Sequence, residues 1–169
     1  MLKRKTPAMV AVVCSIVIAA GAAFADPAAD EKIAAIAQTL DRFHDAASKA
    51  DEKAYFDLFA PDGVFIGTDA AERWPVEAFR KYVVTRFAEG QGWTYRPRQR
   101  HVTLAPIPCG CMAWFDETLD NAVYGTARGS GVLSLTPGGW KIAQYVLSFP
   151  IPNPLAKELT GKIRTFEKH

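Results

Sequence analysis

The sequence has few of the features that build metal centres or bind nucleic acid. Its three histidines show no H-x-H or H-x-x-x-H spacing and predict no metal site. Twenty basic and eighteen acidic residues give a formal charge of +2, too little for a nucleic-acid surface. The G-x-S-x-G, phosphate-loop and dinucleotide-binding motifs are absent. No motif therefore names a reaction, and we expect neither a metal nor another cofactor.

Long apolar runs are also lacking, apart from a short one at the start of the chain. Residues 3–5 are basic, residues 8–22 are mostly apolar, and residues 23–25 read Ala-Phe-Ala, a small-x-small cleavage pattern. This order predicts a secretory signal peptide over residues 1–25. The run is shorter than the roughly 20 residues that span a membrane, although an uncleaved anchor is the alternative. We expect a periplasmic or secreted protein.

The mature chain that this leader predicts is nearly neutral and forms a single domain. Cleavage removes three positive charges and no negative ones, so the formal charge falls from +2 to −1. Residues 26–153 are enough for one domain, and residues 154–169 form a C-terminal tail or short helix. No later segment is apolar enough to span a bilayer, so we expect no membrane insertion after cleavage.

Apolar residues recur with helical spacing in three segments of the first half. Residues 31–49 carry one apolar stripe, which predicts an amphipathic helix. Asp51 suits the N-cap of a second, short helix that ends before Pro61. After a short strand at 64–66, Pro75 suits the first turn of a third helix.

From Trp93 onward the apolar period changes to two, which is typical of strands. Strands are expected over residues 93–104, 111–119, 124–136 and 140–149. Pro97 argues for an edge or a bulge in the first of them, and Gly129 and Gly131 for bending or close backbone approach in the third. The order predicts an α+β cone: three N-terminal helices packed on a strongly bent, mostly antiparallel sheet that encloses a pocket.

Three segments resemble the SnoaL-like branch of the nuclear-transport-factor-2-like superfamily. They are FHDAASKADEKAYFDLFAPDGVFIGTD at 43–69, AWFDETL at 113–119 and ARGSGVLSLTPGGWKIAQYVLSFPIPN at 127–153. The resemblance covers about residues 31–153. It implies a conical fold with a pocket between sheet and helices, and often a dimer. It does not imply one function, because related domains include isomerases, dehydratases, cyclases and non-catalytic modules.

Ketosteroid isomerase is the related enzyme with the clearest chemistry, and this chain departs from it. That enzyme uses a carboxylate base with an oxyanion hole of a tyrosine and a protonated aspartate. By motif matching, the tyrosine falls near Phe43 and the base near Gly67, and neither residue has the needed group. The second acid falls in a segment that reads Arg128-Gly129-Ser130-Gly131. The resemblance therefore does not carry this activity over.

Two adjacent acids in the second of the long strands are candidates for proton transfer. Alternation places Trp114 and Asp116 on one face. It places Phe115 and Glu117 on the other, so either face presents a carboxylate beside an aromatic ring. Burial in a pocket would raise its pKa and suit it to acid–base work. We favour Asp116, which lies deeper in the strand; the alternatives are an exposed acid or a partner of Arg128.

Other polar and aromatic residues are candidates around this acid. An imidazole at His101 near Asp116 would form an acid–base pair, although a surface histidine is the alternative. Arg128 would help to orient a ligand. Aromatic side chains that suit a flat apolar ligand, or that are plain core, are Tyr55, Trp74, Trp93, Tyr95, Trp114 and Tyr145.

Cys109-Gly110-Cys111 contains the one thiol pair of the mature chain. In an oxidising compartment the pair can close a small, reducible ring. Two free cysteines in a turn, or a local disulfide without further role, are the alternatives. The spacing differs from that of the C-x-x-C redox motif.

Two hypotheses from different classes follow. The first is an exported pocket protein that binds or converts a small apolar or aromatic molecule. Its chemistry would be cofactor-free acid–base work such as isomerisation, dehydration or cyclisation. The second is a non-catalytic dimeric module that holds a partner in the cell envelope. Both predict a homodimer and no nucleic-acid partner.

Overall fold

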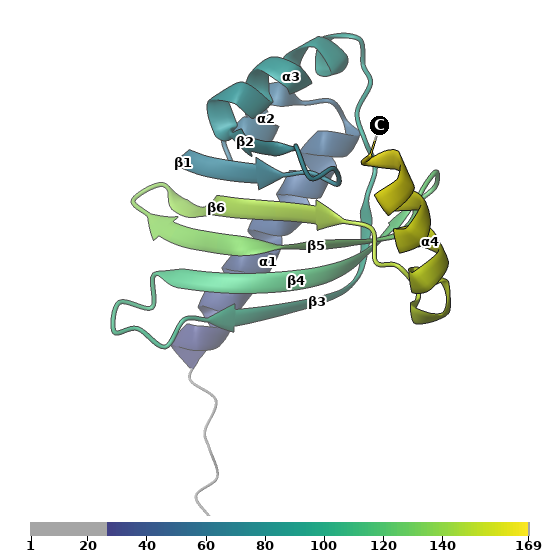
Figure 1. Cartoon of the computed structure of the whole chain (residues 1–169). Helices are drawn as coiled ribbons and strands as arrows, with labels where there is room; N and C mark the ends of the chain where they lie inside the picture. Colours follow the sequence, from purple (N-terminus) through teal and green to yellow (C-terminus); the bar gives the residue numbers. More distant parts are fainter. Residues whose placement is uncertain (1–26, 169) are drawn as a thin grey trace, which may run out of the picture.

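The structure, a computed structural model, describes residues 27–168, so the predicted signal peptide lies outside the described residues. In chain order its elements are α1 (Pro27–Ser48), α2 (Glu52–Phe56), β1 (Phe59–Ile66), β2 (Arg73–Pro75), α3 (Val76–Ala88), β3 (Arg96–Leu104), β4 (Met112–Asn121), β5 (Gly125–Thr136), β6 (Gly139–Ser148) and α4 (Asn153–Phe166) (Figure 1).

The strands form one open, curved sheet in the order β2-β1-β6-β5-β4-β3. Neighbouring strands are antiparallel, except that β1 and β6 run parallel. The helices α1, α2 and α3 lie together on one side of this sheet (Figure 1). The predicted α+β class, with three helices on a bent and mostly antiparallel sheet, is confirmed.

Helix α1 packs on the sheet through the apolar stripe that the sequence shows. Ile36, Leu40 and Phe43 are spaced by four and three residues and are almost fully buried. Asp41 and Asp45 lie on the exposed side of the same helix. The apolar period therefore sets which face of α1 meets the sheet.

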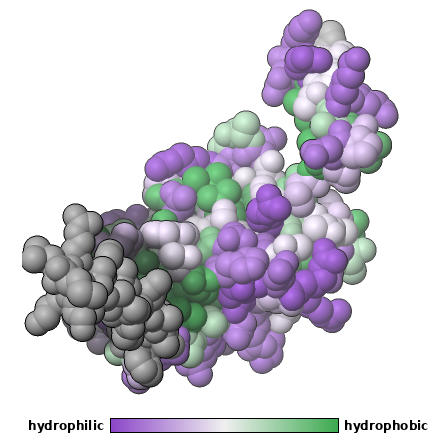
Figure 2. All heavy atoms as spheres, turned by 90° about the horizontal axis from the view of Figure 1, so that it is seen from below, coloured by the Kyte–Doolittle hydropathy of each residue, from purple (hydrophilic) through white to green (hydrophobic). Residues whose placement is uncertain are grey.

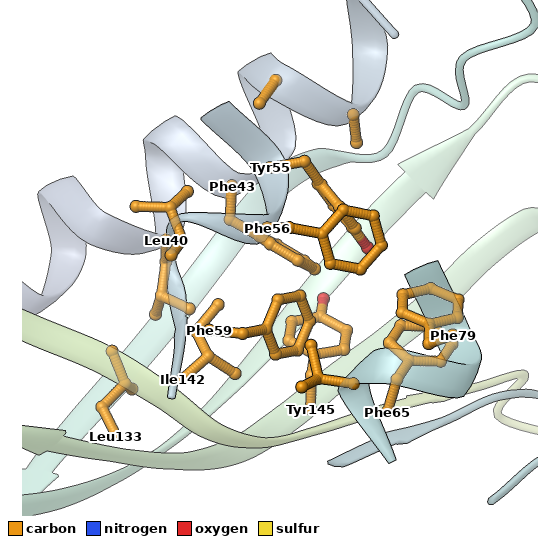
Figure 3. Close-up of a cluster of buried hydrophobic side chains, with 14 of the residues drawn as sticks. Leu40, Phe43, Tyr55, Phe56, Phe59, Phe65, Phe79, Leu133, Ile142 and Tyr145 are labelled. Atoms are coloured by element: carbon orange, nitrogen blue, oxygen red, sulfur yellow. The ribbon is translucent and has the colours of Figure 1, made fainter. Parts of the chain in front are cut away.

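Aromatic rings from all layers meet in the core between helices and sheet (Figure 3). Phe43 of α1 stacks on Tyr55 of α2 with ring centroids 4.6 Å apart. Phe65 of β1 stacks on Phe79 of α3 at 4.0 Å. Rings of this size bury roughly 150–250 Å² each and dominate the apolar contribution to stability. This core fixes the helices on the inner face of the sheet.

The strand β4 shows which of its two faces is the inner one. Phe115 and Glu117 point to the helices and are 3% and 0% exposed. Trp114 and Asp116 point the other way, to the outer face of the sheet. Alternation predicts this split, and only tertiary packing decides which half is buried.

The sequence predictions about Pro97 and the glycines of β5 are confirmed. β3 is an edge strand, and its register against β4 shifts between Pro97 and Gln99. A Cβ added at Gly131 would collide with the carbonyl oxygen of Gln144 on β6. The backbones of β5 and β6 therefore approach at a point where only glycine fits.

Some element boundaries differ from those expected. β1 starts at Phe59, because Phe59 already pairs with Ile142 of β6, and α2 ends earlier at Phe56. Residues 73–75 form β2, which was not predicted because a strand of three residues is too short to show an alternating apolar pattern. The strand expected from Trp93 starts at Arg96, which leaves Trp93 in the preceding loop.

Residues 153–166 form the helix α4, which has no buried residue. Figure 2 shows it as a lobe that projects from the body of the protein. None of the helices among residues 27–168 is long and apolar enough to cross a membrane.

Candidate functional site

A cavity of about 470 Å³ opens between α3, the ends of β1 and β6, and the loop that precedes β3. Its walls are mostly aromatic and apolar: Phe65, Trp74, Phe79, Tyr82, Trp93, Tyr95, Tyr124, Leu147 and Phe149. Its other lining residues are Gly67, Thr68, Glu72 and Arg86. An open cavity with aromatic walls and a few polar groups has a composition that is usual for a small-molecule site.

Contacts among the aromatic rings hold the cavity wall in place. Trp74 packs on Tyr82 with centroids 4.6 Å apart and on Phe79 at 5.4 Å. On the other side, Trp93 packs on Phe87 at 5.0 Å and on Tyr55 at 6.0 Å. Trp74 and Trp93 pack against the core cluster and also line the cavity, so this part of the wall is anchored to the fold.

Glu72 is the one acid among the residues that line the cavity. Its carbonyl oxygen accepts a hydrogen bond from the Gly67 amide at 2.8 Å, and its carboxylate accepts one from the Asp69 amide at 3.2 Å. A Cβ at Gly67 would collide with the Glu72 carboxylate. Because glycine has no side chain, the carboxylate can occupy this space. No ion pair to Glu72 occurs within residues 27–168.

Arg86 and three tyrosines are among the residues with hydrogen-bond donors at the cavity. Arg86 of α3 is exposed and, like Glu72, has no ion-pair partner in the part of the chain that the structure describes. Partial burial raises the pKa of Tyr95, which keeps its hydroxyl protonated at neutral pH. Glu72 and Arg86 were not among the residues predicted from the sequence, because their positions depend on how α3 and the loop before it pack against β1.

Three of the predicted ligand-binding residues, Trp74, Trp93 and Tyr95, line the cavity. Tyr55 and Tyr145 lie behind its wall in the core, with 0% and 2% exposure. Burial raises the pKa of Tyr55 well above 10.0, and the Trp93 indole offsets part of this effect. Tyr55 and Tyr145 thus support the wall and do not face the cavity.

The expectation of a buried Asp116 that faces the pocket is wrong. Asp116 and His101 pair on the outer face of the sheet, with side chains 58% and 61% exposed and Nδ1 3.3 Å from Oδ2. Trp114, which is 48% exposed, and Arg128 lie on the same outer face, away from the cavity. The reason is that Phe115 packs in the core, and strand alternation then turns Glu117 inward and Asp116 outward.

Glu117 is the centre of a buried polar cluster between α1 and the sheet. Its Oε1 lies 2.6 Å from His44 Nε2 and accepts a hydrogen bond from the Tyr145 hydroxyl at 3.0 Å. Arg100 Nε donates to Oε2 at 2.8 Å. Arg100 also donates to Asp41 at 2.7 Å. The cluster ties α1 to β3, β4 and β6.

The charges around Glu117 keep it ionised despite its burial. Burial alone would raise the pKa of Glu117, but the hydrogen bonds and electrostatic interactions with His44 and Arg100 outweigh it and hold the pKa below its ordinary value. Burial, followed by the Glu117 charge, raises the pKa of Tyr145 well above 10.0, so its hydroxyl remains a donor. None of these residues lines the cavity, which points to a structural role.

No cluster of three or more histidine, cysteine, aspartate or glutamate residues within 27–168 is arranged to hold a metal ion. The polar groups at the cavity are instead a single carboxylate, a guanidinium and hydroxyls. A carboxylate can accept or release a proton, and a guanidinium or a hydroxyl can donate a hydrogen bond that orients an oxygen atom of a ligand.

Comparison with known proteins identifies the class. Residues 36–152 match the SnoaL-like domain, and the chain belongs to this family. No curated protein matches the sequence.

Solved structures share the fold at low sequence identity. A protein from Novosphingobium aromaticivorans, provisionally named an aromatic ring hydroxylase, superposes with a TM-score of 0.62 and 20% identity over 73% of this chain and 92% of its own. A nuclear-transport-factor-2-like protein from Streptomyces avermitilis, provisionally named a dehydratase, gives 0.62 and 14% identity over 73% and 99%. A second Novosphingobium aromaticivorans protein, described as having a cystatin-like fold, gives 0.56 and 17% over 76% and 88%. At these identities the likeness establishes the fold alone.

Proposed function

We propose that this SnoaL-like protein binds a small apolar or aromatic molecule in the cavity lined by Trp74, Trp93 and Tyr95. The observation that carries the proposal is a cavity of about 470 Å³ whose walls are aromatic rings anchored to the core. Ligand sites of roughly 300–1,000 Å³ with apolar walls and a few polar groups are typical of small-molecule pockets. A planar ring stacked on Trp74 or Trp93 would gain apolar burial and favourable ring geometry.

Glu72 gives this site an acid–base group, and we propose it in place of Asp116 as the residue that transfers a proton. It lies at the cavity without a counter-ion among residues 27–168, so a ligand that displaces water from it would make it a stronger base. Arg86 and the Tyr95 hydroxyl are donors for an oxygen atom that gains negative charge. This set suits cofactor-free elimination of water next to a carbonyl, and the dehydratase name of one structural neighbour agrees with that reaction class.

Affinity for 2-naphthol, followed by quenching of tryptophan fluorescence, tests the binding proposal. Trp74→Ala removes a cavity wall and is expected to weaken binding by at least about tenfold. Trp114→Ala removes an exposed ring on the outer sheet face and serves as the matched control, with affinity within about twofold. Equal losses in the two variants would contradict binding in the cavity.

Dehydration of 4-hydroxy-4-phenylbutan-2-one, which yields a conjugated enone with strong ultraviolet absorbance, tests the chemistry. Glu72 would remove a proton from the carbon between the carbonyl and the carbinol and would pass that proton to the hydroxyl, which leaves as water. Glu72→Gln is expected to lower the rate about a hundredfold or more. Asp116→Asn should leave it unchanged. Equal rates in the wild type and in Glu72→Gln would refute the assignment.

The second candidate function, a non-catalytic dimeric module, is favoured by one specific observation. Met112 and Trp114 on the outer face of β4 are 42% and 48% exposed. A second copy that covers this face would remove them from water. The two candidates are compatible, because the cavity and the outer face lie on opposite sides of the sheet.

Export of the mature chain to the periplasm is part of the proposal and rests on the leader of residues 1–25. Intact mass of the protein recovered from a periplasmic fraction measures it directly. The expected mass is that of a chain that begins at Asp26, and a mass that matches the chain from Met1 would refute cleavage.

A further inference from the structure

The loop between β3 and β4 carries a disulfide that the proposed function does not use. Cys109 and Cys111 are bonded to each other across a single glycine. The loop joins the end of β3 to the start of β4, whereas Tyr124 of the cavity follows the other end of β4. The disulfide therefore lies at one end of β4 and the cavity residue Tyr124 at the other, and Figure 1 shows the β3–β4 loop at the end of the sheet away from α4.

The bond contributes little to holding the fold together. A disulfide stabilises a protein mainly by restricting the unfolded chain, and the effect grows with the length of the loop that it closes. The two cysteines here are separated by two positions, so the restriction is close to the smallest that a disulfide can impose. Neither cysteine belongs to the buried core cluster. A purely structural role leaves the bond unexplained.

The two sulfur-bearing residues are not equivalent. Cys109 is exposed, whereas Cys111 is half-buried at the start of β4. The carbonyl oxygen of Cys111 accepts a hydrogen bond from the Leu135 amide of β5 at 2.8 Å. An external thiolate can thus approach Cys109, while Cys111 stays anchored to the sheet.

A positive charge lies against the small ring. Gly110 has φ +51°, and a Cβ added to it would come within 2.5 Å of Lys32 Nζ from α1. The Lys32 ammonium therefore packs on the residue that joins the two cysteines. Cations beside a cysteine favour its thiolate form and make it a better leaving group.

We propose that Cys109 and Cys111 form a thiol–disulfide exchange site that oxidises exposed protein or peptide dithiols. A substrate thiolate attacks Cys109 Sγ, which forms a mixed disulfide and releases Cys111 as a thiolate in the ring that Lys32 contacts at Gly110. The second substrate thiolate then attacks the mixed disulfide, so the substrate leaves as a disulfide and Cys109 leaves as a thiolate. The substrate loses two electrons and the protein gains them. A small-molecule disulfide such as oxidised glutathione returns the pair to the oxidised form.

The test mixes the oxidised mature protein with a reduced peptide that contains two cysteines, and follows the peptide disulfide by mass. We expect the exchange to be about tenfold faster than with a short oxidised Cys-Gly-Cys peptide, acetylated at its N-terminus, at equal concentration, because that peptide has no ammonium group. Lys32→Met should remove most of this advantage. A rate equal to that of the short peptide, or no effect of Lys32→Met, would overturn the proposal.

Two further measurements separate exchange from a structural bridge. Reaction with reduced glutathione, quenched by acid, should place glutathione on Cys109 in the trapped mixed disulfide. The double variant Cys109→Ser/Cys111→Ser should lose the exchange reaction but keep a Tm within a few degrees of the wild type, because the ring is so short. Glutathione trapped mainly on Cys111, or a large fall in Tm, would overturn the proposal.

Discussion

At the scale of single residues, the buried acid of β4 is a structural group. Glu117 accepts hydrogen bonds from Tyr145 and Arg100 and lies 2.6 Å from the His44 imidazole. Removal of one member of a buried ion pair is strongly destabilising, because the remaining charge is left buried without a partner. Its neighbour Asp116 is more than half exposed and makes a single long contact to His101. Adjacent residues of the same charge thus have different roles.

The matched substitutions Glu117→Gln and Asp116→Asn test this difference. Glu117→Gln removes the charge that Arg100 and His44 compensate and is expected to lower the free energy of unfolding by about 3 kcal/mol. Asp116→Asn should change it by less than about 0.5 kcal/mol. Urea denaturation at neutral pH measures both values, and equal effects would show that the cluster around Glu117 does not hold the fold.

The same carboxylate predicts how stability depends on acid. The folded-state pKa of Glu117 lies below its ordinary value of 4.5. Its ionised form therefore stabilises the fold above pH 4.5, and this contribution is lost as the pH falls from 4.5 through the folded-state pKa. The difference in stability between wild type and Glu117→Gln should shrink over this acid range. A difference that stays constant to pH 3 would contradict the ion-pair account.

At the scale of elements, strand β5 leaves the room that the buried cluster occupies. A Cβ at Gly129 would collide with the Tyr145 hydroxyl and approach Glu117 Oε1 to 2.9 Å. Gly129→Ala is therefore expected to lower stability by about 1–3 kcal/mol through overpacking. Gly161→Ala on α4, where nothing lies within 4 Å, is the control and should be neutral or slightly stabilising. Thermal unfolding measures the change in Tm of each variant. An unchanged Tm for Gly129→Ala would contradict close packing at this position.

The elements were largely predictable from the sequence, and the inner face of β4 was not. Helical and alternating periods identify α1, α3 and β3 to β6, because each element needs one apolar face. The two faces of β4 each carry an aromatic ring and an acid, so its period alone fits either orientation. Packing of Phe115 against Tyr145, with centroids 5.7 Å apart, settles it. Glu72 and Arg86 escaped notice for a similar reason, since only the folded chain brings them to one cavity.

At the scale of the whole molecule, the outer face of the sheet is the surface that a second copy would cover. Met112 and Trp114 expose apolar area there, and the helices α1, α2 and α3 lie on the other side (Figure 1). We expect a dimer by sedimentation at micromolar concentration. Trp114→Asp would place a charge in that interface and should give a folded monomer whose Tm no longer depends on protein concentration. A wild-type monomer at this concentration would refute the dimer.

The central claim is that the aromatic cavity binds a small ligand. The four tryptophans lie in different parts of the protein, so their signals show where a ligand binds. Trp74 and Trp93 line the cavity, Trp140 lies in the core with 6% exposure, and Trp114 lies on the outer face. Titration of the mature protein with 2-naphthol, followed by the indole N–H signals in NMR spectra, measures each site separately. We predict saturable shifts of the Trp74 and Trp93 signals while those of Trp114 and Trp140 stay in place. Shifts confined to Trp114, or no saturable shift of either cavity tryptophan, would contradict the claim.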